Sequence, residues 1–133
     1  MNGNISTGTL GEQCAVSFLA SQGFSLVAQN VRASFGELDI VCHDQQGVLV
    51  VIEVKTLSRI GSLAPEDNLT HAKFFKLSRM AQFYANSHPE LVHEQQGWRI
   101  DLVTILLNPP PGVETYHYGD TQFAATHYKN ISP

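Results

Sequence analysis

Residues 48–56 of this chain read Val-Leu-Val-Val-Ile-Glu-Val-Lys-Thr, and the first five form the longest apolar run in the sequence. A short apolar run of this kind is typical of a strand buried in a sheet. The preceding residues, Asp44-Gln45-Gln46-Gly47, have the composition of a turn, and residues 37–42 before them alternate between polar and apolar. We therefore predict a β-hairpin, with residues 37–42 as its first strand and residues 48–56 as its second.

The segments around the hairpin predict an α/β fold, a small mixed sheet with helices packed on it. Apolar residues recur at helical spacing from Leu10 to Leu19, and Gly23 beyond them is a natural helix end. A second helix after the hairpin permits a parallel crossover to the next strand. In chain order the expected elements are a helix at 10–19, a strand at 24–28, the hairpin, a helix at about 68–86, and strands at 98–107 and 113–118.

Length and composition indicate one soluble globular domain. The chain has 133 residues, of which 43% are hydrophobic and 15% are charged. We expect a single domain over residues 1–133, with a core at about 8–118 and a loose tail beyond Tyr128. No apolar run approaches the ~20 residues of a membrane span. Residues 1–8 lack the basic and apolar regions of a signal peptide, so we expect a cytoplasmic protein with no membrane partner.

Cysteine and histidine usage gives no sign of a zinc site. Cys14 and Cys42 form no CxxC pair, and we interpret them as reduced core thiols, with a disulfide or a zinc site as the alternatives. The six histidines show no metal-ligand spacing and are interpreted as surface or loop residues. The sequence also has no glycine-rich phosphate loop, which argues mildly against a nucleotide hydrolase.

Strand alternation brings three charged residues to one surface. Residues 51, 53 and 55 share one face of their strand, so Glu53 and Lys55 point the same way, while Ile52 and Val54 point into the opposite layer. On the partner strand, Asp39 lies between Leu38 and Ile40 and projects away from both. If the hairpin register pairs the two polar faces, we expect Asp39, Glu53 and Lys55 to converge.

Two ionised carboxylates a few ångströms apart repel each other, and partial burial penalises both. A hard divalent cation removes this cost, since Mg²⁺ binds through one or two carboxylates together with waters and phosphate oxygens. Lys55 would then orient a water or stabilise charge on phosphorus. The alternative is a solvated strand face with a weak ion pair, which is the usual meaning of an isolated Glu-x-Lys triplet.

Other charged residues have both structural and functional interpretations. Glu12 fits a capping box with Thr9, and it also lies where it would reach the same metal. Lys73, Lys76 and Arg79 form a stripe on the second helix, which is either a phosphate-binding face or a solvated one. For Arg99 and Asp101, which share one strand face, we favour a structural role, either an ion pair or a strand-end contact.

The chain resembles the YraN-like proteins, an uncharacterised bacterial family of the PD-(D/E)XK nuclease-like superfamily that is close to the archaeal Holliday-junction resolvases. The resemblance spans roughly residues 8–103. The matching residues are Gly11-Glu12 and Ala15, Gln29-Asn30-Val31-Arg32, Phe35-Gly36-Glu37-Leu38-Asp39-Ile40-Val41, Val51-Ile52-Glu53-Val54-Lys55-Thr56, Gly61, Lys73, Leu77, Ala81, and Arg99-Ile100-Asp101-Leu102-Val103.

This resemblance implies a restriction-endonuclease-like mixed central sheet flanked by helices. It implies that Asp39 and Glu53 ligate Mg²⁺ or Mn²⁺ and that Lys55 is the catalytic lysine. By the same analogy, Glu12 completes the acidic cluster, in preference to its capping interpretation. The resemblance further suggests the backbone carbonyl of Val54 as a ligand. The candidate nucleic-acid-binding residues are Lys73, which matches a family lysine, Lys76, and Arg59, which would substitute for a family arginine at the position of Leu57.

The leading hypothesis is therefore a metal-dependent endonuclease that hydrolyses phosphodiester bonds in DNA, in branched or otherwise structured DNA in particular. A homodimer would suit an enzyme that cuts two strands. The main alternative is a non-catalytic nucleic-acid- or protein-binding module that keeps the nuclease fold. It is motivated by Leu57 and by the net charge of −4, since DNA-binding proteins usually carry a basic footprint. A phosphatase or nucleotide hydrolase using the same metal is a third possibility.

Overall fold

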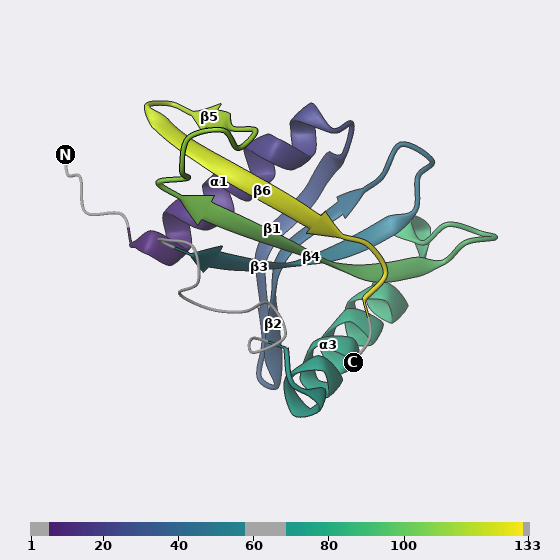
Figure 1. Cartoon of the computed structure of the whole chain (residues 1–133). Coiled ribbons are helices and arrows are strands. Elements are labelled where there is room, and N and C mark those ends of the chain that lie inside the picture. The colour runs from purple at the N-terminus through teal and green to yellow at the C-terminus, as the bar shows by residue number, and fades with distance from the viewer. Residues whose placement is uncertain (1–5, 58–68, 132–133) are drawn as a thin grey trace.

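A computed structural model of the protein describes residues 6–57 and 69–131 (Figure 1). In this part of the chain, two α-helices pack on one six-stranded sheet with the strand order β1-β2-β3-β4-β6-β5. The elements are α1 (Thr7–Ser21), β1 (Ser25–Ala33), β2 (Gly36–His43), β3 (Leu49–Leu57), α3 (His71–Ser87), a short 3₁₀ helix (Pro89–Leu91), β4 (Trp98–Leu107), β5 (Tyr116–Tyr118) and β6 (Thr121–Tyr128).

The sheet is mixed, as predicted. β2 and β3 form the expected antiparallel hairpin, and Gly47 in its turn has a φ of 84°, a left-handed conformation that glycine adopts without strain. β3 and β4 are parallel, which confirms the predicted crossover. The remaining pairs, β1 with β2, β4 with β6 and β5 with β6, are antiparallel.

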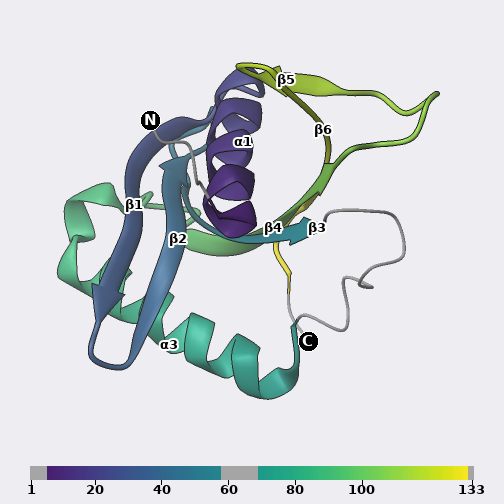
Figure 2. The ribbon, with the colours of Figure 1, turned by 90° about the vertical axis from the view of Figure 1, so that its left-hand side faces the viewer.

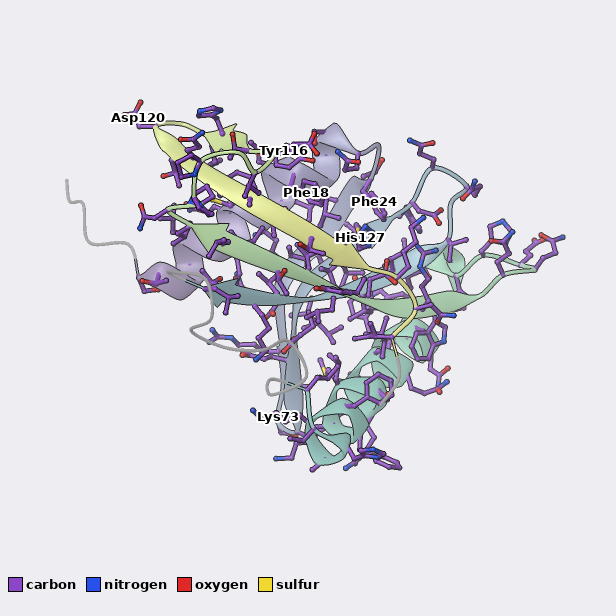
Figure 3. All side chains as sticks on the ribbon, in the orientation of Figure 1. Phe18, Phe24, Lys73, Tyr116, Asp120 and His127 are labelled. Carbon is purple, nitrogen blue, oxygen red and sulfur yellow. The ribbon has the colours of Figure 1, made fainter. Side chains whose placement is uncertain are left out.

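The two helices cover opposite faces of the sheet, which curls around α1 (Figure 2). Side chains of β3 alternate between two cores: Val50, Ile52 and Val54 pack with α1, whereas Leu49 and Val51 pack with α3. The predicted alternation of β3 is therefore confirmed. On the α1 side the core reaches the far edge of the sheet, where the rings of Phe18 and Tyr116 meet at 5.0 Å between centroids (Figure 3).

Alternation along β2 breaks at Asp39, which corrects the prediction for this strand. Leu38 was expected on the same face as Ile40 and Cys42, but it packs in the α3 core together with Val41. The ladder between β2 and β3 runs from His43 and Leu49 to Ile40 and Ile52 and ends there. Asp39 therefore occupies the point at which the two strands separate.

The chain beyond Tyr118 is more ordered than expected. Thr121–Tyr128 forms β6, which was not predicted and which pairs with β4 inside the sheet, so the core extends past residue 118. The tail is tied down as well, because the backbone N–H of Ile131 donates to the carbonyl of Ile100 at 2.9 Å. The expectation of a loose tail is wrong as far as Ile131.

Element boundaries differ by a few residues elsewhere. The described part of helix α3 starts at His71, because the Thr70 hydroxyl caps it by accepting from the backbone N–H of Lys73 at 3.2 Å. Strand β1 is longer than the five residues expected and ends at Ala33. Cys14 and Cys42 are free and buried, as expected. Neither helix of the described residues is long and apolar enough to cross a membrane.

Candidate metal centre and its cleft

Asp39 joins the two separating strands through its side chain. Its Oδ2 accepts a hydrogen bond from the backbone N–H of Val54 at 2.9 Å. In a regular antiparallel ladder a carbonyl of β2 would accept this bond, but the ladder has already ended at Ile40. The carboxylate thus takes the place of a backbone acceptor, and this fixes its position beside β3.

Glu53 and Lys55 lie next to Asp39, as strand alternation predicted. The carboxyl groups of Asp39 and Glu53 lie close enough that each shifts the pKa of the other. The Nζ of Lys55 lies 3.8 Å from Oε2 of Glu53, and the two side chains are only 25% and 22% exposed. The structure therefore brings the three predicted side chains together in a half-buried group, unlike the solvated strand face of the alternative interpretation.

Burial raises the pKa of both carboxyl groups, and the charge of Asp39 raises that of Glu53 further. Burial, followed by the charge of Asp39, raises the pKa of Glu53 from 4.5 to about 7. Burial also raises the pKa of Asp39, against the lowering effects of the Val54 N–H, Glu53 and Lys55. A carboxyl group with a pKa of about 7 beside a second carboxyl group is a place where a divalent cation would replace a proton.

The backbone of Val54 faces the same gap. Its N–H points toward β2, where it meets Asp39, and in a β-strand the N–H and C=O of one residue point to the same side. The Val54 carbonyl therefore also faces β2, at a level where β2 and β3 are no longer paired. A carbonyl oxygen beside two carboxylates is a donor set of hard oxygens, which suits Mg²⁺ or Mn²⁺.

Glu12 approaches this group from helix α1. The capping interpretation is wrong, because the N-cap of α1 is Ser6, whose hydroxyl accepts from the backbone N–H of Thr9. The pKa of Glu12 is raised by burial and then by the charges of Asp39 and Glu37, which places it within electrostatic reach of both. The close packing of α1 on β3 positions it, since a Cβ on Gly11 would overlap the side chain of Thr56.

A cleft of about 240 Å³ opens over Asp39 and Glu53 on the α3 side of the sheet. Its opposite wall carries Lys73 and Lys76. Lys73 lies on the first turn of α3, on the side of the sheet away from α1 (Figure 3). The cleft is therefore acidic on the sheet side and basic on the helix side. Its lining residues are Phe35, Gly36, Glu37, Asp39, Glu53, Leu69, Lys73, Lys76 and Leu77.

Some predicted site residues are not part of this geometry. Arg59 lies outside the described residues, so its prediction stays open. Glu12 does not line the cleft, and within residues 6–57 and 69–131 no three or more His, Cys, Asp or Glu side chains already surround one metal position. A cation here would accordingly be held by the Asp39 and Glu53 pair together with carbonyl or water oxygens, which is a usual arrangement for Mg²⁺.

Arg99 and Asp101 form a structural network instead, as expected. Asp101 is fully buried and accepts from Arg99 Nε at 3.0 Å and from the backbone N–H of Asn130 at 2.8 Å, while His127 Nε2 lies 2.8 Å from its Oδ2. Arg99 also donates to Asp44 in the hairpin turn at 2.8 Å. His127 is thus a strand residue bonded within the fold, which corrects its interpretation as a surface or loop histidine.

Phe35 was not predicted as a site residue, although it lines the cleft and is 39% exposed. The available signal was an aromatic residue in the short turn between two polar strand ends. Its partners come from helix α3, far away in the sequence, so its role depends on the tertiary fold.

The fold and the cleft define a mixed α/β protein with a paired-carboxylate site where two strands of its sheet separate. Residues 11–105 match the model of the family described as "Uncharacterised protein family UPF0102". The chain is 34% identical to a UPF0102 protein of Trichlorobacter lovleyi, over 79% of this chain and 80% of that protein. It is 38% identical to one of Dehalococcoides mccartyi, over 78% and 83%, and 30% identical to one of Dictyoglomus turgidum, over 86% and 94%.

The chain therefore belongs to the uncharacterised protein family UPF0102. This confirms the resemblance to the YraN-like proteins. The matched range includes Asp39, Glu53, Lys55 and the whole of helix α3.

Proposed function

We propose that this protein is a metal-dependent endonuclease that hydrolyses phosphodiester bonds in DNA. The observation that carries the proposal is the half-buried Asp39 and Glu53 pair, whose carboxyl groups lie close enough to shift each other's pKa, with Lys55 beside it. Such a pair destabilises the fold when both groups are ionised, and a bound divalent cation relieves that repulsion. The restriction-endonuclease-like architecture and the PD-(D/E)XK placement are part of the same proposal.

Asp39, Glu53 and the Val54 carbonyl would hold the cation, and Glu12 would add negative charge from α1. A bound Mg²⁺ or Mn²⁺ supplies polarisation of a phosphoryl oxygen and a lowered pKa of water. The Val54 N–H keeps the Asp39 carboxylate in one orientation, so the acidic pair is positioned before any substrate arrives. Because the site is half-buried, its charges interact more strongly than they would in water.

Lys55 is the proposed catalytic lysine. Its ammonium group lies 3.8 Å from Glu53, within reach of a phosphate bound at the same carboxylates. There it would orient the attacking water and stabilise the charge that develops on phosphorus. Lys73 and Lys76 face the acidic pair across the cleft and would hold the phosphates on either side of the scissile bond.

Cleavage assays with plasmid, single-stranded and four-way-junction DNA in Mg²⁺ or Mn²⁺ test the proposal. We expect cleavage by the wild-type protein, loss of cleavage in the isosteric variants Asp39→Asn and Glu53→Gln, and no change in Glu114→Gln, which alters an exposed loop carboxylate. Lys55→Met should lose cleavage and keep Mn²⁺ binding. Absence of cleavage by the wild type, or equal cleavage by Glu53→Gln, would overturn the proposal.

The alternative is a binding module that keeps this fold without catalysis. Two observations favour it: the net charge of −4, and Leu57 at the end of β3 in place of the arginine suggested by the resemblance. A binding module would still bind its partner after the substitutions Asp39→Asn and Glu53→Gln, with or without a divalent metal. Binding that disappears together with metal binding would count against this alternative.

A further inference from the structure

A second, larger groove lies on the outer surface of helix α3, beside the acidic cleft. It measures about 480 Å³ and is lined by Phe35, Phe75, Phe83 and Arg79 together with the polar residues Ser78, Gln82 and Asn86. Phe75 is 68% exposed, Phe83 48% and Phe35 39%. Three exposed phenylalanines in one groove are unusual for a surface without a ligand, because clustered exposed apolar side chains mark binding sites.

The aromatic side chains are held in a defined geometry. The rings of Phe35 and Phe83 meet edge to face, with centroids 5.2 Å apart and planes at 84°. The guanidinium of Arg79 lies over the ring of Phe35, 5.6 Å from its centroid. These contacts order Phe35 and Arg79 next to each other, so that a flat ligand would meet a pre-arranged aromatic and cationic surface.

Helix α3 is positively charged although the protein as a whole is acidic. Helix α3 carries Lys73, Lys76 and Arg79 and contains no Asp or Glu in its 17 residues, while the whole chain has a net charge of −4. The three cations follow one another at three-residue intervals, which places them along one side of the helix. The basic stripe therefore favours a negatively charged ligand.

The groove and the acidic cleft adjoin at Phe35, which lines both. Lys76 lies on the cleft side and Arg79, one step along the stripe, on the groove side. A polyanion held by the stripe would thus cross from Asp39 and Glu53 into the aromatic groove. Consecutive parts of one chain-like ligand would occupy the two sites.

We propose that the aromatic groove binds unpaired nucleotides of single-stranded DNA that flank the phosphate in the acidic cleft. This inference rests on the proposed function, since it names the form of DNA at that site. Bases stack on Phe35 and Phe75 and their phosphates contact Arg79 and Lys76, the combination by which proteins bind single strands without reading sequence. The amide side chains of Gln82 and Asn86 offer donors and acceptors to base edges. The substrate class is therefore DNA with an unpaired segment at the cut.

A second copy of the chain is a less favourable occupant. A two-fold interface over the same groove would bring the basic stripes of two α3 helices close together, and α3 supplies no carboxylate to offset them. Like charges placed opposite each other at an interface oppose association.

Fluorescence anisotropy in Ca²⁺ buffer tests the inference. The probes are a labelled oligo(dT), an abasic oligonucleotide of the same length and a blunt duplex, with the wild-type protein, Phe75→Ala and Phe75→Trp. We expect Phe75→Ala to weaken oligo(dT) binding about fivefold to a hundredfold, the range for one lost base stack. Phe75→Trp should retain binding, and binding to the abasic probe and the duplex should be unchanged. The matched control is Tyr118→Ala, an aromatic side chain 39% exposed on β5.

Equal oligo(dT) binding by Phe75→Ala and wild type would overturn the inference, as would equal losses on all three probes. A wild-type dimer in sedimentation that Phe75→Ala converts to monomer would overturn it too, in favour of a second copy in the groove. Cleavage assays on the same proteins separate this outcome from the proposed function. If the wild type binds oligo(dT) through Phe75 but never cleaves DNA, the inference stands and the proposed nuclease function is contradicted. If the wild type cleaves DNA and Phe75→Ala binds oligo(dT) equally well, the nuclease function stands and the inference is contradicted.

Discussion

The carboxylate of Asp39 accepts a hydrogen bond from the backbone N–H of Val54 at 2.9 Å, just beyond the point where the ladder between β2 and β3 ends. This contact does two things at once. It satisfies a backbone donor that strand separation would otherwise leave unpaired, and it holds a carboxylate beside Glu53. The break in the sheet and the acidic pair are therefore one feature of the fold.

Asp39→Asn should lower the pKa of Glu53. The amide oxygen of asparagine still accepts from Val54, so the strand junction is kept, but the charge that opposes ionisation of Glu53 is removed. We expect the pKa of Glu53 to fall from about 7 toward the ordinary value of 4.5, stopping above it because burial remains. Carbon-detected NMR titration of the Glu53 carboxyl measures this. An unchanged Glu53 pKa would show that Asp39 contributes nothing to it.

In metal-free buffer, the stability of the protein should fall as pH rises from about 5 to about 8. The pKa of Glu53 is about 7 in the folded chain and near 4.5 when unfolded, so between these values the folded chain holds a proton that the unfolded chain has lost. Stability is then present at low pH and lost as pH rises, by about 1 to 3 kcal/mol. Urea unfolding across this range measures the change.

Glu53→Gln should flatten this dependence, and Mg²⁺ should restore stability at the alkaline end for the wild type alone. The pKa values of Asp44 and Asp101 are lowered from 3.8, so these two groups make stability fall as pH drops below about 4. Their effect lies outside the range of pH 5 to 8. A wild-type protein that gains stability with rising pH in metal-free buffer would contradict the assignment of a raised pKa to Glu53.

Gly11→Ala should disturb the site through helix α1. The added methyl group would overlap the side chain of Thr56, so α1 must move away from β3, and Glu12 moves with it. We expect a loss of about 1 to 3 kcal/mol in stability, as for other overpacked positions, and weaker Mn²⁺ binding. Gly8→Ala is the matched control, because Gly8 lies on the same helix and a Cβ there would meet no atom within 4 Å. Equal Mn²⁺ affinity in both variants would remove Glu12 from the acidic cluster.

Asp101→Ala should be strongly destabilising without any direct effect on the cleft. The substitution would remove the ion pair of Arg99 with Asp101 and the hydrogen bond that the backbone N–H of Asn130 donates to Asp101. Removal of one partner from a buried ion pair costs about 3 to 5 kcal/mol of stability. Arg32→Ala, which breaks the exposed pair with Glu37 at 3.3 Å, should cost less than about 1 kcal/mol. Denaturant unfolding of the two variants compares them, and similar losses would contradict the structural role of Asp101.

Much of the site follows from local pattern, because alternation along one buried strand is a reliable geometric rule. Glu53, Lys55, Ile52 and Val54 lie on the faces that alternation predicts. Asp39 also reaches the site, but through a break in alternation that sends Leu38 to the α3 core. Sequence alone does not reveal such a break, because it depends on where two strands stop pairing.

The remaining differences arise from long-range packing. β6 was missed because Thr121–Tyr128 alternates weakly between polar and apolar residues, yet its Phe123 is fully buried against the α1 core. The aromatic groove combines Phe35 of the β1–β2 turn with side chains of α3 that follow about forty residues later. Only the folded chain places them together.

The most direct test is anomalous diffraction from crystals soaked in Mn²⁺ above the pKa of Glu53. We predict one strong manganese peak between the carboxylates of Asp39 and Glu53, with the Val54 carbonyl in its coordination shell, and loss of that peak in Glu53→Gln. A manganese-free cleft under these conditions, or a peak that persists in Glu53→Gln, would contradict the metal centre on which the proposed function depends.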